Sequence, residues 1–182
     1  MERFGPEVVG QDGRLNRARL AELAFQGGRI NELNAIVHPA VILEQRRWMR
    51  EVFRRDPAAV AVVESALIFE VERDARARGE KESVLADWRR RIDRVVVVTA
   101  PDDVKVARYA SRVGRDEVGR AAAATDAQMR LKHQIPDTVK AAKADYVLEN
   151  TGDKEALRVQ VAELWERLKA ESNKFLEDES LK

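Results

Sequence analysis

The sequence predicts an α/β domain built on a parallel sheet, and three observations support this fold class. Residues 59–70, 94–100 and 145–150 are short apolar runs with the composition of buried strands. Segments with helical patterns separate them, as in repeated strand–helix units. The first and third runs end in polar residues, Glu70 and Asn150. Parallel sheets bind ligands at the carboxyl ends of their strands.

Length and composition narrow the class of protein. The 182 residues are 45% hydrophobic, which suits one domain or one domain with an inserted helical subdomain. No apolar run approaches the ~20 residues of a membrane span, and no signal-peptide pattern is present, so we expect a cytoplasmic protein without a membrane partner. Zero cysteines exclude disulfides and thiolate chemistry, and a net charge of +1 argues against a nucleic-acid partner.

The first third of the chain has helical patterns throughout. Asn16 is a suitable N-cap for a short helix that Gly27 and Gly28 end. A second short helix is expected to stop at His38, because the residue before a proline is pushed out of the α region. A longer helix then starts at Pro39. Its apolar stripe is expected to face the core and comprises Val41, Ile42, Trp48, Met49, Val52 and Phe53.

The first predicted strand covers residues 59–70 and is followed by a charged segment, residues 71–92. Val84, Leu85, Trp88 and Ile92 give this segment a helical pattern, which predicts one or two surface helices. The second strand ends before Asp102 and Asp103, which favour the first turn of the next helix because acids stabilise a helix N-terminus.

A stripe of cations follows in that helix. Lys105, Arg108, Arg112 and Arg115 recur at intervals of three or four residues and so share a face. Guanidinium groups at the carboxyl end of a strand can clamp phosphate oxygens with paired hydrogen bonds. The same spacing also suits a solvated face with acidic partners elsewhere, and the residues alone leave both interpretations open.

Residues 114–121, G-R-D-E-V-G-R-A, have the glycine spacing of a phosphate-binding loop, G-x-x-x-x-G-K-[ST]. Arg120 and Ala121 replace the lysine and the hydroxyl residue, and no strand precedes the segment, so we expect a break between two helices. After the third strand, a final helix starts near Asp153. It is expected to bury four residues, Leu157, Val161, Leu164 and Leu168, and a polar tail follows at residues 171–182.

Several motifs, taken in order, resemble bacterial dephospho-CoA kinases. They are F-G-P-E-V-V-G-Q-D-G-R-L-N-R-A-R-L from Phe4, A-I-V-H-P-A-V-I from Ala35, E-S-A-L-I-F-E from Glu64, R-V-V-V-V-T-A-P from Arg94, the Arg108 and Arg112 pair, and Q-I-P-D-T-V-K-A-A-K-A-D-Y-V-L-E-N-T-G from Gln134. The resemblance covers nearly the whole chain. It implies a fold with a P-loop-kinase-like parallel sheet. It also implies an enzyme that transfers the γ-phosphoryl group of ATP, with Mg2+, to the ribose 3′-hydroxyl of dephospho-CoA.

The resemblance also assigns parts. Residues 1–57 would be the helical subdomain that binds dephospho-CoA, with His38 and Glu70 on that side of the site. Residues 58–170 would be the remaining kinase core, with a helical lid at about residues 101–143. Arg108 and Arg112 would contact ATP phosphates from the lid, Asn150 would border the base, and Glu64 would be the acid on the magnesium side. The resemblance does not determine the oligomeric state.

The chain also departs from the family pattern. The first strand, its G-x-x-x-S-G-K-S loop and the strand that supplies the expected catalytic aspartate have no counterpart in the sequence, so its sheet would lack its first strands. Residues 71–88 and 114–129 resemble insertions. We therefore expect the 182-residue chain alone to be an inactive, truncated kinase. The alternatives are a non-catalytic protein that binds a CoA-like ligand, and a module that binds nucleic acid or a protein partner through the arginine stripe, which the near-neutral charge argues against.

Overall fold

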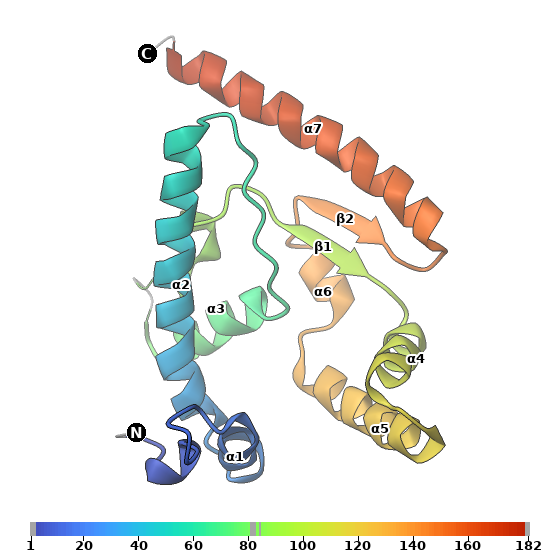
Figure 1. The fold of residues 1–182 in the computed structure, drawn as a ribbon. Coiled ribbons are helices and arrows are strands. Elements are labelled where there is room, and N and C mark those ends of the chain that lie inside the picture. Colours follow the sequence, from blue (N-terminus) through green and yellow to red (C-terminus); the bar gives the residue numbers. More distant parts are fainter. Residues whose placement is uncertain (1–2, 81–82, 84, 181–182) are drawn as a thin grey trace. The chain divides into compact units, whose positions relative to one another are not determined.

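The computed structural model describes residues 3–80, 83 and 85–180. These residues fold into two compact units, Met1–Glu51 and Val52–Lys182. The long helix α2 (Ile30–Arg55) begins in the first unit and ends in the second (Figure 1). Val84, which contributed to the predicted surface-helix pattern, lies outside the described residues.

The first unit begins with a tight N-terminal turn. The short 3-10 helix η1 (Pro6–Val8) leads into an isolated bridge between Val9 and Leu15. Asn16 then caps α1 (Arg17–Ala21), because its side chain accepts a hydrogen bond from Arg19 N at 3.0 Å. A π-helical turn, η2 (Glu22–Gln26), continues α1, and Gly28 follows with a φ of +67° that a side chain would disfavour. The predicted short helix and its glycine stop are confirmed.

Helix α2 differs from the sequence expectation in two ways. The predicted break at His38 is wrong, since the helix runs unbroken through Pro39. A proline inside a helix removes one backbone hydrogen bond, and the remaining bonds of a 26-residue helix are sufficient to maintain it. Its apolar stripe is also not core throughout: Ile42 is buried, whereas Val41 and Trp48 are nearly half exposed.

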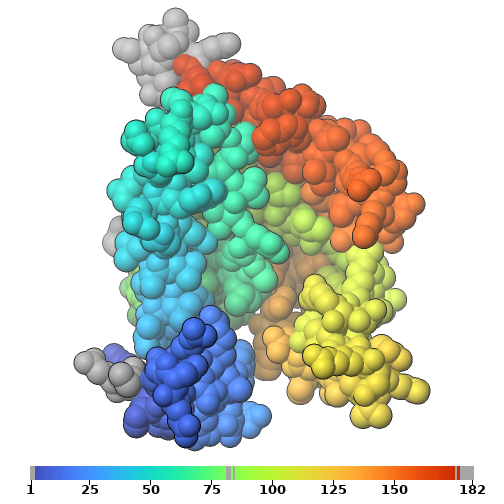
Figure 2. Space-filling view, in the orientation of Figure 1, coloured from blue at the N-terminus to red at the C-terminus, as the bar shows by residue number. Residues whose placement is uncertain are grey.

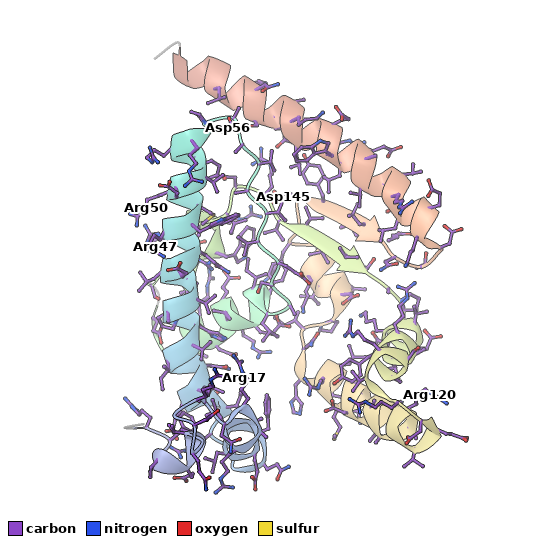
Figure 3. The ribbon with its side chains drawn as sticks, in the orientation of Figure 1. Arg17, Arg47, Arg50, Asp56, Arg120 and Asp145 are labelled. Atoms are coloured by element: carbon purple, nitrogen blue, oxygen red, sulfur yellow. The ribbon has the colours of Figure 1, made fainter. Side chains whose placement is uncertain are left out.

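The second unit contains a two-stranded parallel sheet. Strands β1 (Val96–Thr99) and β2 (Tyr146–Glu149) pair in register from Val96 with Tyr146 to Thr99 with Glu149. Asp145, labelled in Figure 3 near the start of β2, accepts a hydrogen bond from Val95 N at 2.7 Å and fixes the amino ends of both strands. The predicted second and third strands are confirmed, and so is their parallel arrangement.

The predicted first strand is not present. Residues 59–67 have no regular structure, and the segment ends in α3 (Ile68–Ala77), so Glu70 lies in the first turn of a helix. An apolar, β-branched run becomes a strand only when a neighbour satisfies its backbone groups, and β1 and β2 pair with each other. Val62 is 73% exposed as a result, and one edge of β1 has no described strand beside it.

The core of the second unit packs on the sheet. Phe69 of α3 and Trp88 of η3 (Trp88–Arg90) meet edge to face, with ring centroids 5.9 Å apart, and both pack with Val95 and Val97. Trp88 and Leu85 are buried, so the segment predicted to lie on the surface instead supplies the core. Two large aromatic rings in this contact add packing energy beyond their buried area.

The remaining helices follow the strands. Helix α4 (Asp102–Val113) leaves β1, with Asp102 and Asp103 in its first turn as predicted. Helices α5 (Glu117–His133) and α6 (Asp137–Ala141) lead to β2, and α7 (Lys154–Ser180) closes the chain. Helix α7 begins directly after Asp153, as expected, and the Asp153 side chain caps it by accepting a hydrogen bond from Ala156 N. Leu157, Leu164 and Leu168 are only half-buried and Val161 is 47% exposed, so the predicted burial of this helix is wrong for Val161.

Candidate functional site at the carboxyl end of the strands

The carboxyl ends of β1 and β2 bring two of the predicted site residues together. Arg108 of α4 donates from Nη1 to the carbonyl oxygen of Asn150 at 3.0 Å and from Nη2 to that of Gly152 at 3.5 Å. Asn150 N in turn donates to Thr99 O at 2.8 Å, which ties both strand ends together. Arg108 is exposed and its charge is not neutralised by carbonyl partners, so its other N–H groups can meet an anion.

Lys105 belongs to the same stripe but is held by two carboxylates. Its Nζ lies 2.9 Å from Asp102 Oδ1 and 2.7 Å from Asp137 Oδ2. Burial lowers the pKa of Lys105, but hydrogen bonds to Asp137 and Asp102 outweigh burial and raise its pKa overall. Asp137 also accepts a hydrogen bond from Ala100 N at 3.4 Å. Lys105 therefore fixes the start of α4 against the start of α6.

Arg112 lies one turn beyond Arg108 and contacts Tyr109. The guanidinium carbons of Arg112 and Arg130 lie 5.8 and 5.7 Å from the centre of the Tyr109 ring. The Tyr109 hydroxyl donates to Asp126 Oδ2 at 2.9 Å, and Arg130 Nε donates to the same oxygen at 2.8 Å. These contacts join α4 to α5 and orient Arg112, because cation–π attraction favours a guanidinium placed over an aromatic face.

The Tyr109–Asp126 hydrogen bond gives the α4–α5 pair a pH dependence. It raises the pKa of Tyr109 and lowers the pKa of Asp126. The tyrosine contribution is complete below its ordinary pKa of about 10 and is lost as pH rises through the raised value. The aspartate contribution is complete above its ordinary pKa of about 4 and is lost as pH falls through the lowered value.

We expect Tyr109→Phe to lower the free energy of unfolding by a constant amount between about pH 5 and pH 9. The difference from the wild type should shrink outside that window, because one partner of the bond changes its protonation state. Urea denaturation at a series of pH values measures this difference. A difference that stays constant from pH 3 to pH 11 would contradict the assignment.

The segment with phosphate-loop spacing is a helix break, as predicted. Gly114 caps the end of α4, and Asp116 caps α5 through Gly119 N at 2.7 Å. A Cβ atom on Gly114 would lie 2.4 Å from Arg120 N and 2.5 Å from Arg120 Cα. Figure 3 labels Arg120 on α5, beside this turn. Close packing of two helices, rather than a phosphate, therefore requires glycine at position 114.

The other predicted site residues belong to different elements. Glu64 is exposed in the irregular segment, and His38 is half-buried in α2 of the first unit. Glu70 is buried, and its Oε1 lies 2.8 Å from Lys140 Nζ. Sequence reasoning missed Lys140, Asp137 and Asp126. Lys140 and Asp137 bind Glu70 and Lys105, which are distant in the sequence, so no local spacing could have indicated them. Asp126 also pairs with Arg130 at the i,i+4 spacing of a helix, which is a local signal.

The described residues do not form a preformed metal site. No group of three His, Asp or Glu side chains among residues 3–80, 83 and 85–180 could hold an ion. Glu64 is a single exposed carboxylate, and one carboxylate does not provide the several oxygen ligands of a dedicated magnesium site. Among the described helices, none combines the length and apolarity that crossing a membrane requires.

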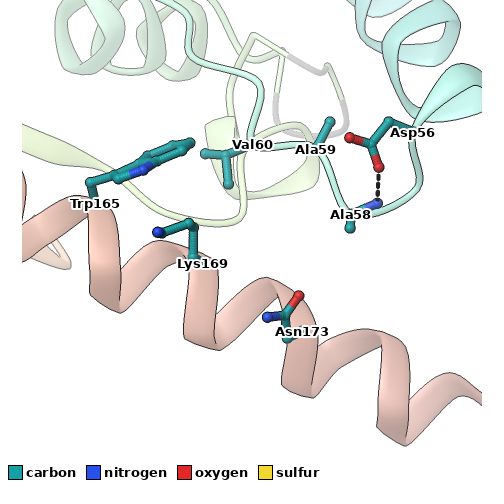
Figure 4. Close-up of a pocket in the computed structure, with 7 residues that line it drawn as sticks. All are labelled: Asp56, Ala58, Ala59, Val60, Trp165, Lys169 and Asn173. Atoms are coloured by element: carbon teal, nitrogen blue, oxygen red, sulfur yellow. Dashed lines mark hydrogen bonds between the residues drawn. The ribbon is translucent and has the colours of Figure 1, made fainter.

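A separate hollow lies between residues 56–60 and α7 (Figure 4). It has a volume of about 370 Å³ and is lined by Asp56, Ala58, Ala59, Val60, Trp165, Lys169 and Asn173. Gln160 of α7 binds Glu149 at the carboxyl end of β2, whereas Glu171 binds Arg94, just before β1. The hollow therefore lies toward the amino ends of the strands, away from the edge where parallel sheets bind ligands.

The fold and the site define an α/β protein whose cationic helix leaves the carboxyl edge of a parallel sheet. A sequence model of the dephospho-CoA kinase family matches residues 1–155. Dephospho-CoA kinases of Moorella thermoacetica and Corynebacterium diphtheriae are each 32% identical to the chain, over 91% and 90% of its length. That of Syntrophotalea carbinolica is 34% identical over 91%. The aligned regions cover 68%, 71% and 68% of these relatives. The chain belongs to the dephospho-CoA kinase family.

Proposed function

We propose that this protein acts in the phosphorylation of dephospho-CoA by ATP, in which the γ-phosphoryl group passes to the ribose 3′-hydroxyl. The observation that carries the proposal is the family match over residues 1–155. The geometry supports it, because a charged guanidinium lies at the carboxyl ends of both strands. Protein groups accelerate such a transfer mainly by positioning the reactants and stabilising charge.

Within this function, the hairpin formed by α4 and α5 would be the lid over ATP. Arg108 and Arg112 would contact the phosphates, and Asn150 would border the base. Glu64 would be the acid on the magnesium side of the site, although the described residues do not form a complete metal site by themselves. The helical region up to residue 57 would receive dephospho-CoA, with His38 and Glu70 on that side, and residues 58–170 would form the kinase core.

We also propose that a further strand pairs with the free edge of β1 in the active enzyme. Two observations support this. Residues 59–67 are mostly apolar but pair with no described strand, and Val62 is 73% exposed. Val98 on β1 is 51% exposed. A strand between β1 and residues 59–67 would satisfy both backbones and cover both side chains, and it would carry the phosphate-binding loop that the resemblance implies.

The lid assignment can be tested in a chimera in which the corresponding N-terminal segment of the Moorella thermoacetica relative is joined to Met1. We expect Arg108→Met and Arg112→Met each to lower kcat/KM for ATP by about 10²–10³-fold, as loss of one preorganised charge contact typically does. Steady-state assays at varied ATP measure this effect. Arg158→Met is the matched control, since Arg158 pairs with Glu155 on an exposed face of α7. Equal losses in all three variants would count against the assignment.

A further inference from the structure

Glu70 is buried in a way that its predicted role on the dephospho-CoA side does not explain. The residue is 5% exposed, and Lys140, its partner on α6, is 8% exposed. Lys140 Nζ lies 2.8 Å from Glu70 Oε1 and donates to the carbonyl oxygen of Ala66 at 3.4 Å. Burial of such a pair costs desolvation energy that the mutual attraction often does not recover, so stability alone is a weak reason for it.

The same carboxylate also binds the backbone between α5 and α6. Ile135 N donates to Glu70 Oε1 at 2.9 Å, and the Ile135 side chain packs on the core cluster of Phe69, Trp88, Val95 and Val97. Ile135 is the central residue of the three-residue connection that follows α5 and precedes α6. Glu70 therefore holds the point where the hairpin of α4 and α5 returns to the sheet.

The other end of the hairpin is held by different contacts. Lys105 pairs with Asp137, and Arg108 binds the carbonyl groups of Asn150 and Gly152, so α4 is fixed where it leaves β1. Beyond these two attachments, the hairpin projects from the rest of the second unit in the space-filling view, where it is yellow to gold (Figure 2). Its orientation depends on the two attachments.

We propose that Glu70 is a positioning residue whose buried carboxylate clamps the α5–α6 connection and thereby sets the direction of the α4–α5 hairpin. Its second oxygen, Oε2, is buried without a hydrogen-bond partner among the described atoms. That arrangement favours a role in geometry over one in stability. The consequence for Arg108 and Arg112 in catalysis rests on the proposed function, whereas the clamp itself does not.

A distance measurement on the 182-residue chain tests the clamp without substrate. The chain has no cysteine, so Val118→Cys and Val159→Cys, both at exposed positions, give two unique spin-label sites on the hairpin and on α7. Two double variants are compared. Glu70→Leu with Lys140→Met removes the acceptor for Ile135 N, whereas Glu70→Gln with Lys140→Met keeps an acceptor oxygen. Neither variant leaves an unpaired buried charge at this site.

We expect the leucine variant to broaden the distance distribution at least twofold in width, and the glutamine variant to keep the width of the wild type. Identical distributions in both variants would overturn the proposal. Hydrogen exchange on the unmodified chain provides a second measurement that does not depend on the folding of a variant. We expect the Ile135 amide to exchange as slowly as the amides of β1. Exchange at the rate of exposed turns would overturn the clamp. Both readouts are independent of kinase activity.

Discussion

The purified 182-residue chain is expected to form no coenzyme A from dephospho-CoA and ATP. Its sequence holds no G-x-x-x-x-G-K-[ST] motif. Gly114 lies in the packed break after α4, and Gly119 lies in the first turn of α5. Phosphoryl transfer depends on a cradle of backbone N–H groups and a lysine around the phosphates. Chromatographic separation of coenzyme A from dephospho-CoA measures turnover, with the Moorella thermoacetica relative as the active control. Turnover by the purified chain would contradict the expectation.

The chimera with the N-terminal segment of that relative provides the complementary experiment. We expect it to phosphorylate dephospho-CoA, because the added strand and loop would supply both the cradle and a partner for β1. Titration calorimetry of the chain alone with dephospho-CoA measures binding, which helps to distinguish a kinase from a non-catalytic binding protein. Tight binding by a well-folded chain together with an inactive chimera would favour a non-catalytic CoA-binding protein over a kinase.

Replacing Gly114 by alanine is expected to destabilise the second unit by about 2–3 kcal/mol, the upper part of the range for overpacking. The added Cβ would lie 2.4 Å from the backbone nitrogen of Arg120, and backbone atoms cannot rotate away as a side chain can. Urea denaturation followed by circular dichroism measures the loss. The α4–α5 turn must open to accept the methyl group, so the effect should be largest in this hairpin.

Gly152→Ala is the matched control for this substitution. A Cβ atom at Gly152 would meet only the Ala156 side chain, at 3.5 Å, which is an ordinary contact. We expect a change in the free energy of unfolding of less than about 0.5 kcal/mol, the usual range for surface substitutions. Equal destabilisation by the two alanine variants would show that the close approach between Gly114 and Arg120 does not exist in solution.

Local patterns predicted the elements that depend on local physics. The predicted cap Asn16 and the predicted start of the last helix near Asp153 are both found, because each side chain reaches a backbone N–H group three residues away. The apolar runs before Pro101 and Asn150 form strands that pair with each other, and Asp102 and Asp103 begin α4. Residues 59–67 failed as a strand because the pattern cannot say whether a neighbouring strand is present.

The candidate site was predicted in part. Arg108 and Asn150 could be grouped because strand ends and the following helices meet at one edge of a parallel sheet. The clamp at Glu70 could not, since Ile135 and Lys140 are 65 and 70 residues further along the chain. Contacts of this kind are defined by the packing of α3 against α6, and nothing in the spacing of the residues indicates them.

The sequence by itself determined the family, the two paired strands, the helix caps and the cationic helix, because motifs, β-branched composition and capping residues act over a few neighbouring positions. Only the tertiary structure decided that residues 59–67 have no neighbouring strand in the described part of the chain and that Trp88 lies in the core. It also showed that the close approach of Arg120 requires glycine at position 114. It also decided that Glu70 lies inside the second unit, bound to Lys140. Those outcomes depend on which surfaces meet, and burial and pairing are properties of two segments together.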